Sequence, residues 1–296
     1  MLRSRVVMNV LTEVLSPSFL LRDALYTSVV IGLACPVVGV FLVLRRMVFM
    51  GVALPQISST GVALALSLHA LGHIHLEHGS FDTHSLAFVG SLVFSILAVT
   101  VLAFLERRRV AWNEARIGAL YVLSTATSLL LLAKCPTAER GWLNLFKGEI
   151  IAISDSDLKL TLGAFAGVLF LLWLFRKEII LVSYDRELAM TLRKAVFGWD
   201  LLLYLLIGLA ISVAVTAVGP LVTFGFLLLP PLAVRPFAGT MRQFVVASSV
   251  LGGLASVVGF VLAYHWDLPV GPTDVALLGV VCGLGNGLHW LRARLR

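Results

Sequence analysis

A histidine-rich segment offers the clearest metal chemistry in the sequence. Five of the chain's seven histidines fall between residues 69 and 84, together with two acidic residues. Neutral imidazole and carboxylate are good ligands for zinc and other first-row divalent cations. Because the spacing matches no closed structural site, the pattern predicts a loose, exchangeable metal-binding loop, and a polar loop without metal is the alternative. The candidate ligands are His73, His75, Glu77, His78, Asp82 and His84.

Small polar side chains form a second cluster, inside an otherwise apolar stretch that runs from Gly51 to Gly61. Polar groups at membrane depth usually face a cavity or another helix. The cluster therefore predicts either part of a translocation pathway or a set of hydrogen bonds between helices. Its members are Pro55, Gln56, Ser58, Ser59 and Thr60.

The apolar segment from Gly219 to Pro231 is broken at both ends by glycine and proline. Proline removes a backbone donor and kinks a membrane helix, and broken helices often line pathways. Pro230 is therefore a further pathway candidate, and a kink that serves only packing is the alternative.

The longest basic connection runs over residues 176–198. Ser183 or Asp185 can cap a short helix there, with acidic residues in its first turn and Arg193 near its end. Such a helix, held between two spans, could dock a soluble partner. The alternative is an ordinary solvated loop.

Composition indicates that these groups belong to a membrane protein. Apolar residues make up 59% of the 296 residues and charged residues 13%, whereas an average soluble domain has about 45–50% and about 25%. This excludes a water-soluble enzyme, a nucleic-acid-binding protein and a disordered chain as first interpretations. We expect one all-helical transmembrane domain over residues 1–296, with about nine spans and a range of eight to ten. The apolar stretches are 24–44, 52–71, 85–105, 117–133, 159–175, 199–217, 220–234, 243–264 and 273–291.

The connections between the stretches alternate in charge, so the net charge of +7 predicts topology rather than nucleic-acid binding. Basic connections follow every second stretch, and 72–84 and 265–272 contain no Lys or Arg. The positive-inside rule then places the C-terminus in the cytoplasm. Residues 1–20 are expected along the membrane surface. The sequence contains no P-loop motif, and Asp274 is the acid expected at membrane depth, so energy for transport would have to come from a partner.

Taken in order, several segments resemble the membrane-spanning permeases of bacterial ABC importers for zinc, manganese and iron. The resemblance extends over about residues 20–290, and it is carried by the order and spacing of the segments together. These segments are Gly39–Met47, Gly51–Gly61, Glu114–Gly118, Phe146–Asp155, Tyr184–Ala189, Val218–Pro230 and Asp267–Pro272.

The resemblance implies a type II ABC importer fold in the bacterial cytoplasmic (inner) membrane. It implies a permease dimer, homomeric or heteromeric, with cytoplasmic ATPases and an exoplasmic solute-binding protein. A divalent metal ion would be the substrate, no cofactor would be bound permanently, and the permease itself would not be an enzyme. The resemblance also implies that 185–197 is the coupling helix, with Asp185, Arg186, Glu187 and Ala189 as docking residues.

The sequence departs from this family in two places. Relatives usually have an acid and a histidine where Val52 and Gln56 stand, and a glycine near the end of the coupling helix, where Leu192, Arg193 and Lys194 stand. A stand-alone secondary transporter of divalent cations that uses the histidine-rich loop is the second interpretation. A membrane enzyme with a histidine-ligated metal is the third.

Overall fold

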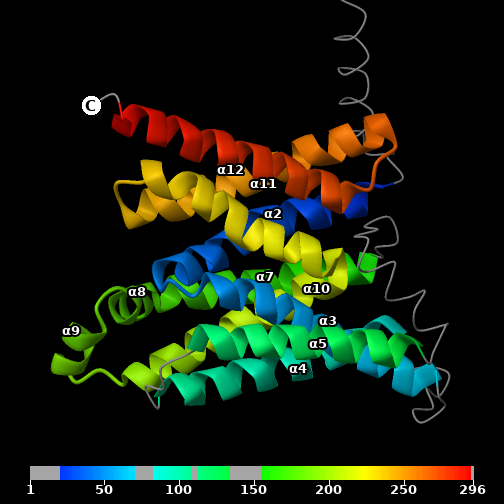
Figure 1. The fold of residues 1–296 in the computed structure, drawn as a ribbon, viewed down its shortest axis with the longest axis horizontal. Coiled ribbons are helices and arrows are strands. Elements are labelled where there is room, and N and C mark those ends of the chain that lie inside the picture. The colour runs from blue at the N-terminus through cyan, green and yellow to red at the C-terminus, as the bar shows by residue number, and fades with distance from the viewer. Residues whose placement is uncertain (1–20, 71–82, 108–112, 134–154, 295–296) are drawn as a thin grey trace, which may run out of the picture.

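The computed structural model describes residues 21–70, 83–107, 113–133 and 155–294. These residues form helices and short connections without a strand, which confirms the all-helical prediction for this part of the chain. Figure 1 shows the long helices lying roughly alongside one another. The helices are α2 (Arg22–Leu44), α3 (Val48–Ala70), α4 (Thr83–Arg107), α5 (Asn113–Ala133), α7 (Asp155–Leu174), α8 (Arg176–Tyr184), α9 (Arg186–Thr191), α10 (Val196–Val234), the 3-10 helix η2 (Arg235–Phe237), α11 (Met241–Trp266) and α12 (Val270–Arg294).

Seven of the described helices are long and apolar enough to cross a membrane. They are α2, α3, α4, α5, α7, α11 and one continuous stretch formed by α10 with η2. A multi-pass helical membrane protein is therefore confirmed, whereas the predicted count of nine spans is not. The difference arises because residues 199–217 and 220–234, two helical halves joined at Gly219, form one continuous stretch in this count, and because α12 is not among the seven helices.

Helix α10 reverses its direction at Gly219, whose φ of 82° and ψ of 167° are not helical. Before this residue, α10 packs antiparallel to α4, with Gly208 beside Val99. After it, α10 runs parallel to α12, with Gly225 beside Val275. Both ends of α10 lie on the left of Figure 1, beside α9 and η2. Glycine is suited to this position because it has no Cβ to oppose a positive φ.

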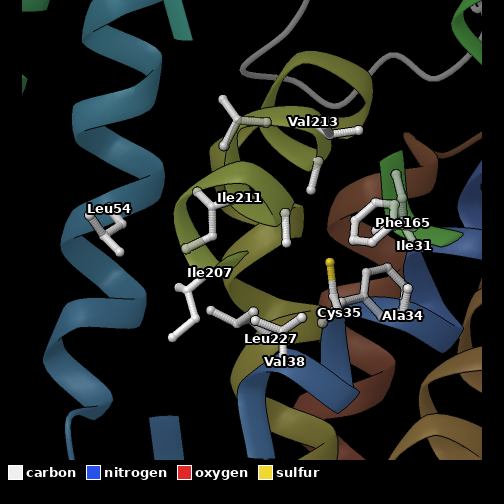
Figure 2. Packing of buried hydrophobic residues seen from close by; sticks show 14 of the residues in the cluster. Ile31, Ala34, Cys35, Val38, Leu54, Phe165, Ile207, Ile211, Val213 and Leu227 are labelled. Carbon is white, nitrogen blue, oxygen red and sulfur yellow. The ribbon is translucent and has the colours of Figure 1, made fainter. Parts of the chain in front are cut away.

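The first half of α10 forms the centre of the apolar core. Figure 2 shows Ile207 and Ile211 between Leu54 of α3 on one side and Ile31 and Cys35 of α2 on the other. All five of these side chains are 0% exposed. Dispersion contacts between closely packed side chains stabilise such a core even where lipid, rather than water, surrounds it.

The outer helices expose large apolar side chains. Leu123 and Leu130 of α5 are 62% and 71% exposed, and Trp173 of α7 is 61% exposed. In water this would be unfavourable, but lipid tails are as apolar as leucine. The exposed faces of α5 and α7 are therefore lipid-facing surfaces.

Glycines allow two pairs of helices to touch through their backbones. A Cβ on Gly61 of α3 would clash with the carbonyl oxygen of Gly90 on α4. A Cβ on Gly252 of α11 would clash in the same way with Gly32 of α2. Small residues at such crossings let membrane helices approach closely.

The basic connections within the described residues all lie at one end of the bundle, on the left of Figure 1. We call this the basic end, and its cytoplasmic location stays a prediction of the positive-inside rule. Its basic residues include Arg45, Arg46, Arg116, Arg176, Lys177, Arg186, Arg193, Lys194, Arg235 and Arg242.

Candidate translocation pathway and docking segment

The polar cluster predicted to line a pathway lies in the middle of α3. Pro55, Gln56, Ser58, Ser59 and Thr60 are all buried, and Gln56, the most exposed of the polar ones, is only 7% exposed. Buried polar groups need hydrogen-bond partners. The partners of these groups show which helices the cluster joins.

Ser58 belongs to a chain of hydroxyl groups that joins three helices. Its Oγ is hydrogen-bonded to Oγ of Ser91 on α4. Ser91 Oγ in turn lies 2.9 Å from Oγ of Ser212 on α10. All three side chains are 0% exposed. The chain fastens α3, α4 and the first half of α10 together at membrane depth.

Thr60 connects α3 to α5 in a similar way. Its hydroxyl donates to the backbone carbonyls of Gln56 at 2.9 Å and Ser124 at 3.0 Å. Ser128 Oγ donates to Thr60 Oγ1 at 2.9 Å. These bonds support the reading of the cluster as hydrogen bonds between helices. Its role in a translocation pathway stays a prediction.

Pro230 is buried in the second half of α10, next to Pro231. The sequence predicted a break at both ends of the segment from Gly219 to Pro231, and the structure has one at Gly219, whose φ and ψ are not helical. At Pro230 the backbone stays helical, and α10 continues to Val234.

Most of the predicted metal ligands fall outside the described residues, namely His73, His75, Glu77, His78 and Asp82. His84 lies in the first turn of α4. Over the described ranges no group of three or more His, Cys, Asp or Glu side chains comes together. At the two positions where the family resemblance predicts an acid and a histidine, Val52 and Gln56 lie in α3 and offer neither an imidazole nor a carboxylate.

Asp274, predicted at membrane depth, belongs to α12 and is fully buried against α2 and α11. Its Oδ2 accepts a hydrogen bond of 3.4 Å from Ser28. Its Oδ1 has no hydrogen-bond partner in the described part of the chain. Gly259 leaves room for this carboxylate, because a Cβ there would collide with Oδ1.

The docking segment forms two short helices, α8 and α9, at the basic end. Asp185 separates them, and its side chain accepts a hydrogen bond of 2.9 Å from the backbone N–H of Leu188. This confirms Asp185 as the N-cap of a short helix. Glu187 is exposed in the first turn, where a negative charge is favourable.

Two of the predicted docking residues contact the bundle, although the side chain of Arg186 is still 43% exposed. Ala189 is 0% exposed. Arg186 Nη2 lies 2.7 Å from Oδ2 of Asp200 on α10. In this conformation both residues hold α9 against the rest of the chain.

Besides its charged residues, this segment exposes four large apolar side chains that were not predicted from the sequence. Tyr184, Leu188, Met190 and Leu192 are 82%, 47%, 44% and 56% exposed. A helix of six residues is too short to show an amphipathic period. In the sequence, the feature that could have indicated a docking surface is the presence of these four large apolar residues in a basic connection.

The sequence analysis also missed the ion-pair network that anchors this segment. Arg45, at the end of α2, lies 2.7 Å from Oδ1 of Asp200 through Nη1, and its Nε donates to Ser183 Oγ at 2.9 Å. The side chains of Arg45 and Asp200 are only 8% and 5% exposed. The guanidinium of Arg45 also lies 5.5 Å from the ring centroid of Tyr204. One carboxylate therefore connects α2, α9 and α10.

Helix α9 ends in a Schellman motif with an arginine in the position that usually holds glycine. Lys194 N–H bonds to Ala189 O and Arg193 N–H to Met190 O, and Arg193 has a φ of 54°. Glycine adopts this conformation without the steric cost that other residues incur. The departure from relatives at 192–194 therefore leaves the fold of the turn intact.

Replacing Arg193 with glycine is expected to raise the apparent stability of the permease by about 1 kcal/mol, because it relieves the left-handed strain. Thermal unfolding of the purified protein in detergent measures this. Arg193→Ala, which removes the side chain but keeps the Cβ, should give no such gain. An equal gain from alanine would show that charge, rather than backbone conformation, is responsible.

Comparison with known proteins gives consistent matches. The family model described as ABC 3 transport family matches residues 18–284. The manganese import system permease protein ScaB of Streptococcus gordonii is 28% identical over 255 residues, which cover 86% of each chain. The manganese transport system membrane protein MntC of Halalkalibacterium halodurans is 24% identical and covers 92% of this chain and 88% of its own.

The fold also matches a solved structure, that of PsaBC from Streptococcus pneumoniae in complex with Fab. The TM-score is 0.78 at 26% identity, and the match covers 93% of this chain and 94% of the other.

Proposed function

Because the chain belongs to the ABC 3 transport family, we propose that it is the membrane-spanning permease subunit of a divalent metal importer and that manganese is its substrate. The observation that carries this proposal is the match over residues 18–284, joined to relatives whose names specify manganese import. No relative reported above is named for zinc or iron, the other two metals expected from the sequence. As a permease, the chain is a transport component and not an enzyme.

The docking segment gives the permease a way to respond to a cytoplasmic ATPase. We infer that the exposed apolar side chains of α8 and α9 contact the ATPase, since α9 projects from the basic end (Figure 1). The bonds of Asp200 to Arg186 and Arg45 then connect α9 to α10 and to the α2–α3 turn. A displacement of α9 would thus reach the helices of the core through the carboxylate of Asp200, which is buried. A second permease copy and an exoplasmic solute-binding protein complete the proposed importer.

The stand-alone secondary transporter is not favoured by the family or by the buried charges. Over the described ranges the buried carboxylates are Asp200 and Asp274. Asp200 is neutralised by two arginines, and Asp274 is not accompanied by a relay of further charges. A proton-coupled carrier would need such a relay across the membrane.

Uptake by the reconstituted importer tests the proposal directly. Liposomes that contain the permease, its ATPase and the binding protein should accumulate manganese only when ATP is supplied on the ATPase side. Zinc and iron should compete weakly. Uptake by the permease alone, driven by an ion gradient, would instead establish the secondary transporter.

The histidine-rich loop is expected to raise uptake when manganese is scarce. Replacing His73, His75, His78 and His84 with asparagine keeps polarity but removes the imidazole ligands. We expect uptake at limiting manganese to fall several-fold and uptake at saturating manganese to stay unchanged. The wild-type advantage should shrink as the pH falls through about 6.5, because protonated imidazole cannot ligate a metal.

His265→Asn is the control for the loop, since this histidine lies at the end of α11, outside the cluster. It should leave uptake unchanged at every metal concentration. If the four-histidine variant behaves like this control, the loop does not capture metal, although the permease assignment survives.

A further inference from the structure

A cavity of about 350 Å³ lies at the basic end, where α2, α3, α4, α5, α8, α9 and α10 meet. This is at the small end of the range of ligand-binding cavities. One part of its wall is polar and includes four arginines, and the other part is apolar. The arginines are Arg45, Arg46, Arg116 and Arg186, and the apolar side chains include Met47, Phe49, Met50, Leu102, Ile117 and Val182.

The charge of the cavity is strongly unbalanced. Asp200 is the acid that lines it, against four guanidinium groups, and this carboxylate already pairs with Arg45 and Arg186. Arg46 and Arg116 have no ion pair with any residue that the structure describes. The wall therefore carries an excess of about three positive charges at neutral pH, because arginine does not lose its proton in proteins.

Arg45 also has a donor without a partner. Its Nε and Nη1 are bonded to Ser183 and Asp200, but its buried Nη2 has no hydrogen-bond partner among the described residues. A buried donor that lacks an acceptor is costly, and for a charged group more so. An anion in the cavity would supply the acceptor.

The backbone at Arg46 is a second unusual feature of this wall. α2 ends in a Schellman motif, with Met47 N–H bonded to Leu42 O and Arg46 N–H to Val43 O. Arg46 occupies the left-handed position with a φ of 58°. Glycine would fit there without strain, so the arginine brings charge to the cavity at a conformational cost.

The depth of the cavity indicates the kind of anion. It lies where the membrane helices α3, α4 and α5 meet the basic end, and these three helices supply Phe49, Met50, Leu102 and Ile117 to its apolar wall. Basic pockets between membrane helices on the cytoplasmic side bind the phosphate groups of anionic lipids. Arginine recognises phosphate through paired N–H donors.

We propose that this cavity binds a phosphate-bearing anion through Arg45, Arg46 and Arg116. An anionic phospholipid headgroup and a free phosphate compound share this chemistry. Since the same wall contains Tyr184 and Arg186 from the docking segment, a bound anion stabilises α8 and α9 in the position described here. The inference concerns binding by the permease alone and stands whether or not manganese is the substrate.

Lipid binding by the purified full-length permease in detergent tests the proposal. Native mass spectrometry measures the affinities for phosphatidylglycerol and for phosphatidylcholine. The test variant combines Arg46→Gly with Arg116→Gln, and the first of these changes relieves backbone strain, so the variant should fold. The control combines Arg193→Gly with Arg242→Gln, which makes the same chemical changes at the same end, outside the cavity.

We expect the wild type to prefer phosphatidylglycerol. With about 1 kcal/mol per arginine near an anionic headgroup, the test variant should bind it about 30-fold more weakly. The control should stay within about twofold of the wild type. A second arm adds inorganic phosphate to protein in phosphatidylcholine nanodiscs and measures the melting temperature. A rise in the wild type that is absent from the test variant identifies free phosphate compounds as ligands, and no rise leaves the lipid as the source.

Two results would overturn the proposal. The first is a wild type that neither prefers phosphatidylglycerol nor responds to phosphate. The second is a test variant that binds both probes as the control does. If such a variant also fails to assemble with the ATPase, the arginines serve the protein partner instead.

Discussion

Replacing both Leu188 and Met190 with aspartate is expected to abolish ATP-driven uptake while the melting temperature of the permease stays unchanged. Both side chains are almost half exposed on α9, so the folded permease alone loses little by the change. An apolar contact with a partner, by contrast, cannot accept two buried carboxylates without counter-charges. Uptake in liposomes and co-purification with the ATPase measure the two effects separately.

Phe237→Asp provides the matched control for this loss. Phe237 is 53% exposed in η2, at the same end of the bundle but outside the docking segment. It should leave uptake and ATPase assembly intact. Normal uptake by the Leu188→Asp, Met190→Asp variant would show that α9 does not dock the ATPase.

Removing the carboxylate of Asp200 is expected to cause the largest loss of stability among single substitutions discussed here. Asp200→Ala leaves Arg45 buried without its counter-ion, and such broken pairs typically cost about 3–5 kcal/mol. The loss should appear in thermal or denaturant unfolding in detergent. Uptake should fall as well, because α9 would no longer be fastened to α10.

Two further variants test whether the loss of stability comes from leaving Arg45 without its counter-ion. Asp23→Ala removes a more exposed carboxylate, 3.4 Å from Arg22, and should cost less than about 1 kcal/mol. Asp200→Leu combined with Arg45→Met replaces the buried pair with apolar side chains and should recover much of the stability. A double variant as unstable as Asp200→Ala would mean that the arginine's counter-ion is not the cause.

The positions of the helices could be predicted because lipid as a solvent imposes a simple pattern. The stretch 24–44 coincides with α2 to within two residues, and 243–264 lies within α11 (Met241–Trp266). Charged residues bound most of these stretches, and charge is expensive in the hydrocarbon core. The boundary between 199–217 and 220–234 has no such charge, because the reversal at Gly219 occurs without any polar connection.

The candidate sites were less predictable because they depend on contacts between distant segments. The cap formed by Asp185 is local, since donor and acceptor are three residues apart, and the sequence indicated it. The pairing of Arg45 with Asp200 spans 155 residues, and no periodicity reveals it. The burial of Ala189 likewise depends on how α9 lies against the bundle.

The reversal within α10 has a consequence for how the chain enters the membrane. The two halves of α10 meet at Val218, Gly219 and Pro220, none of which carries a charge or a polar side chain. A hairpin of this kind can leave the translocon as one apolar unit, since no hydrophilic loop has to be carried across the bilayer. The histidine-rich segment before α4 is the opposite case, because its imidazoles and carboxylates must be translocated. During biogenesis the α10 hairpin therefore inserts against a lower barrier than the pair of α3 and α4.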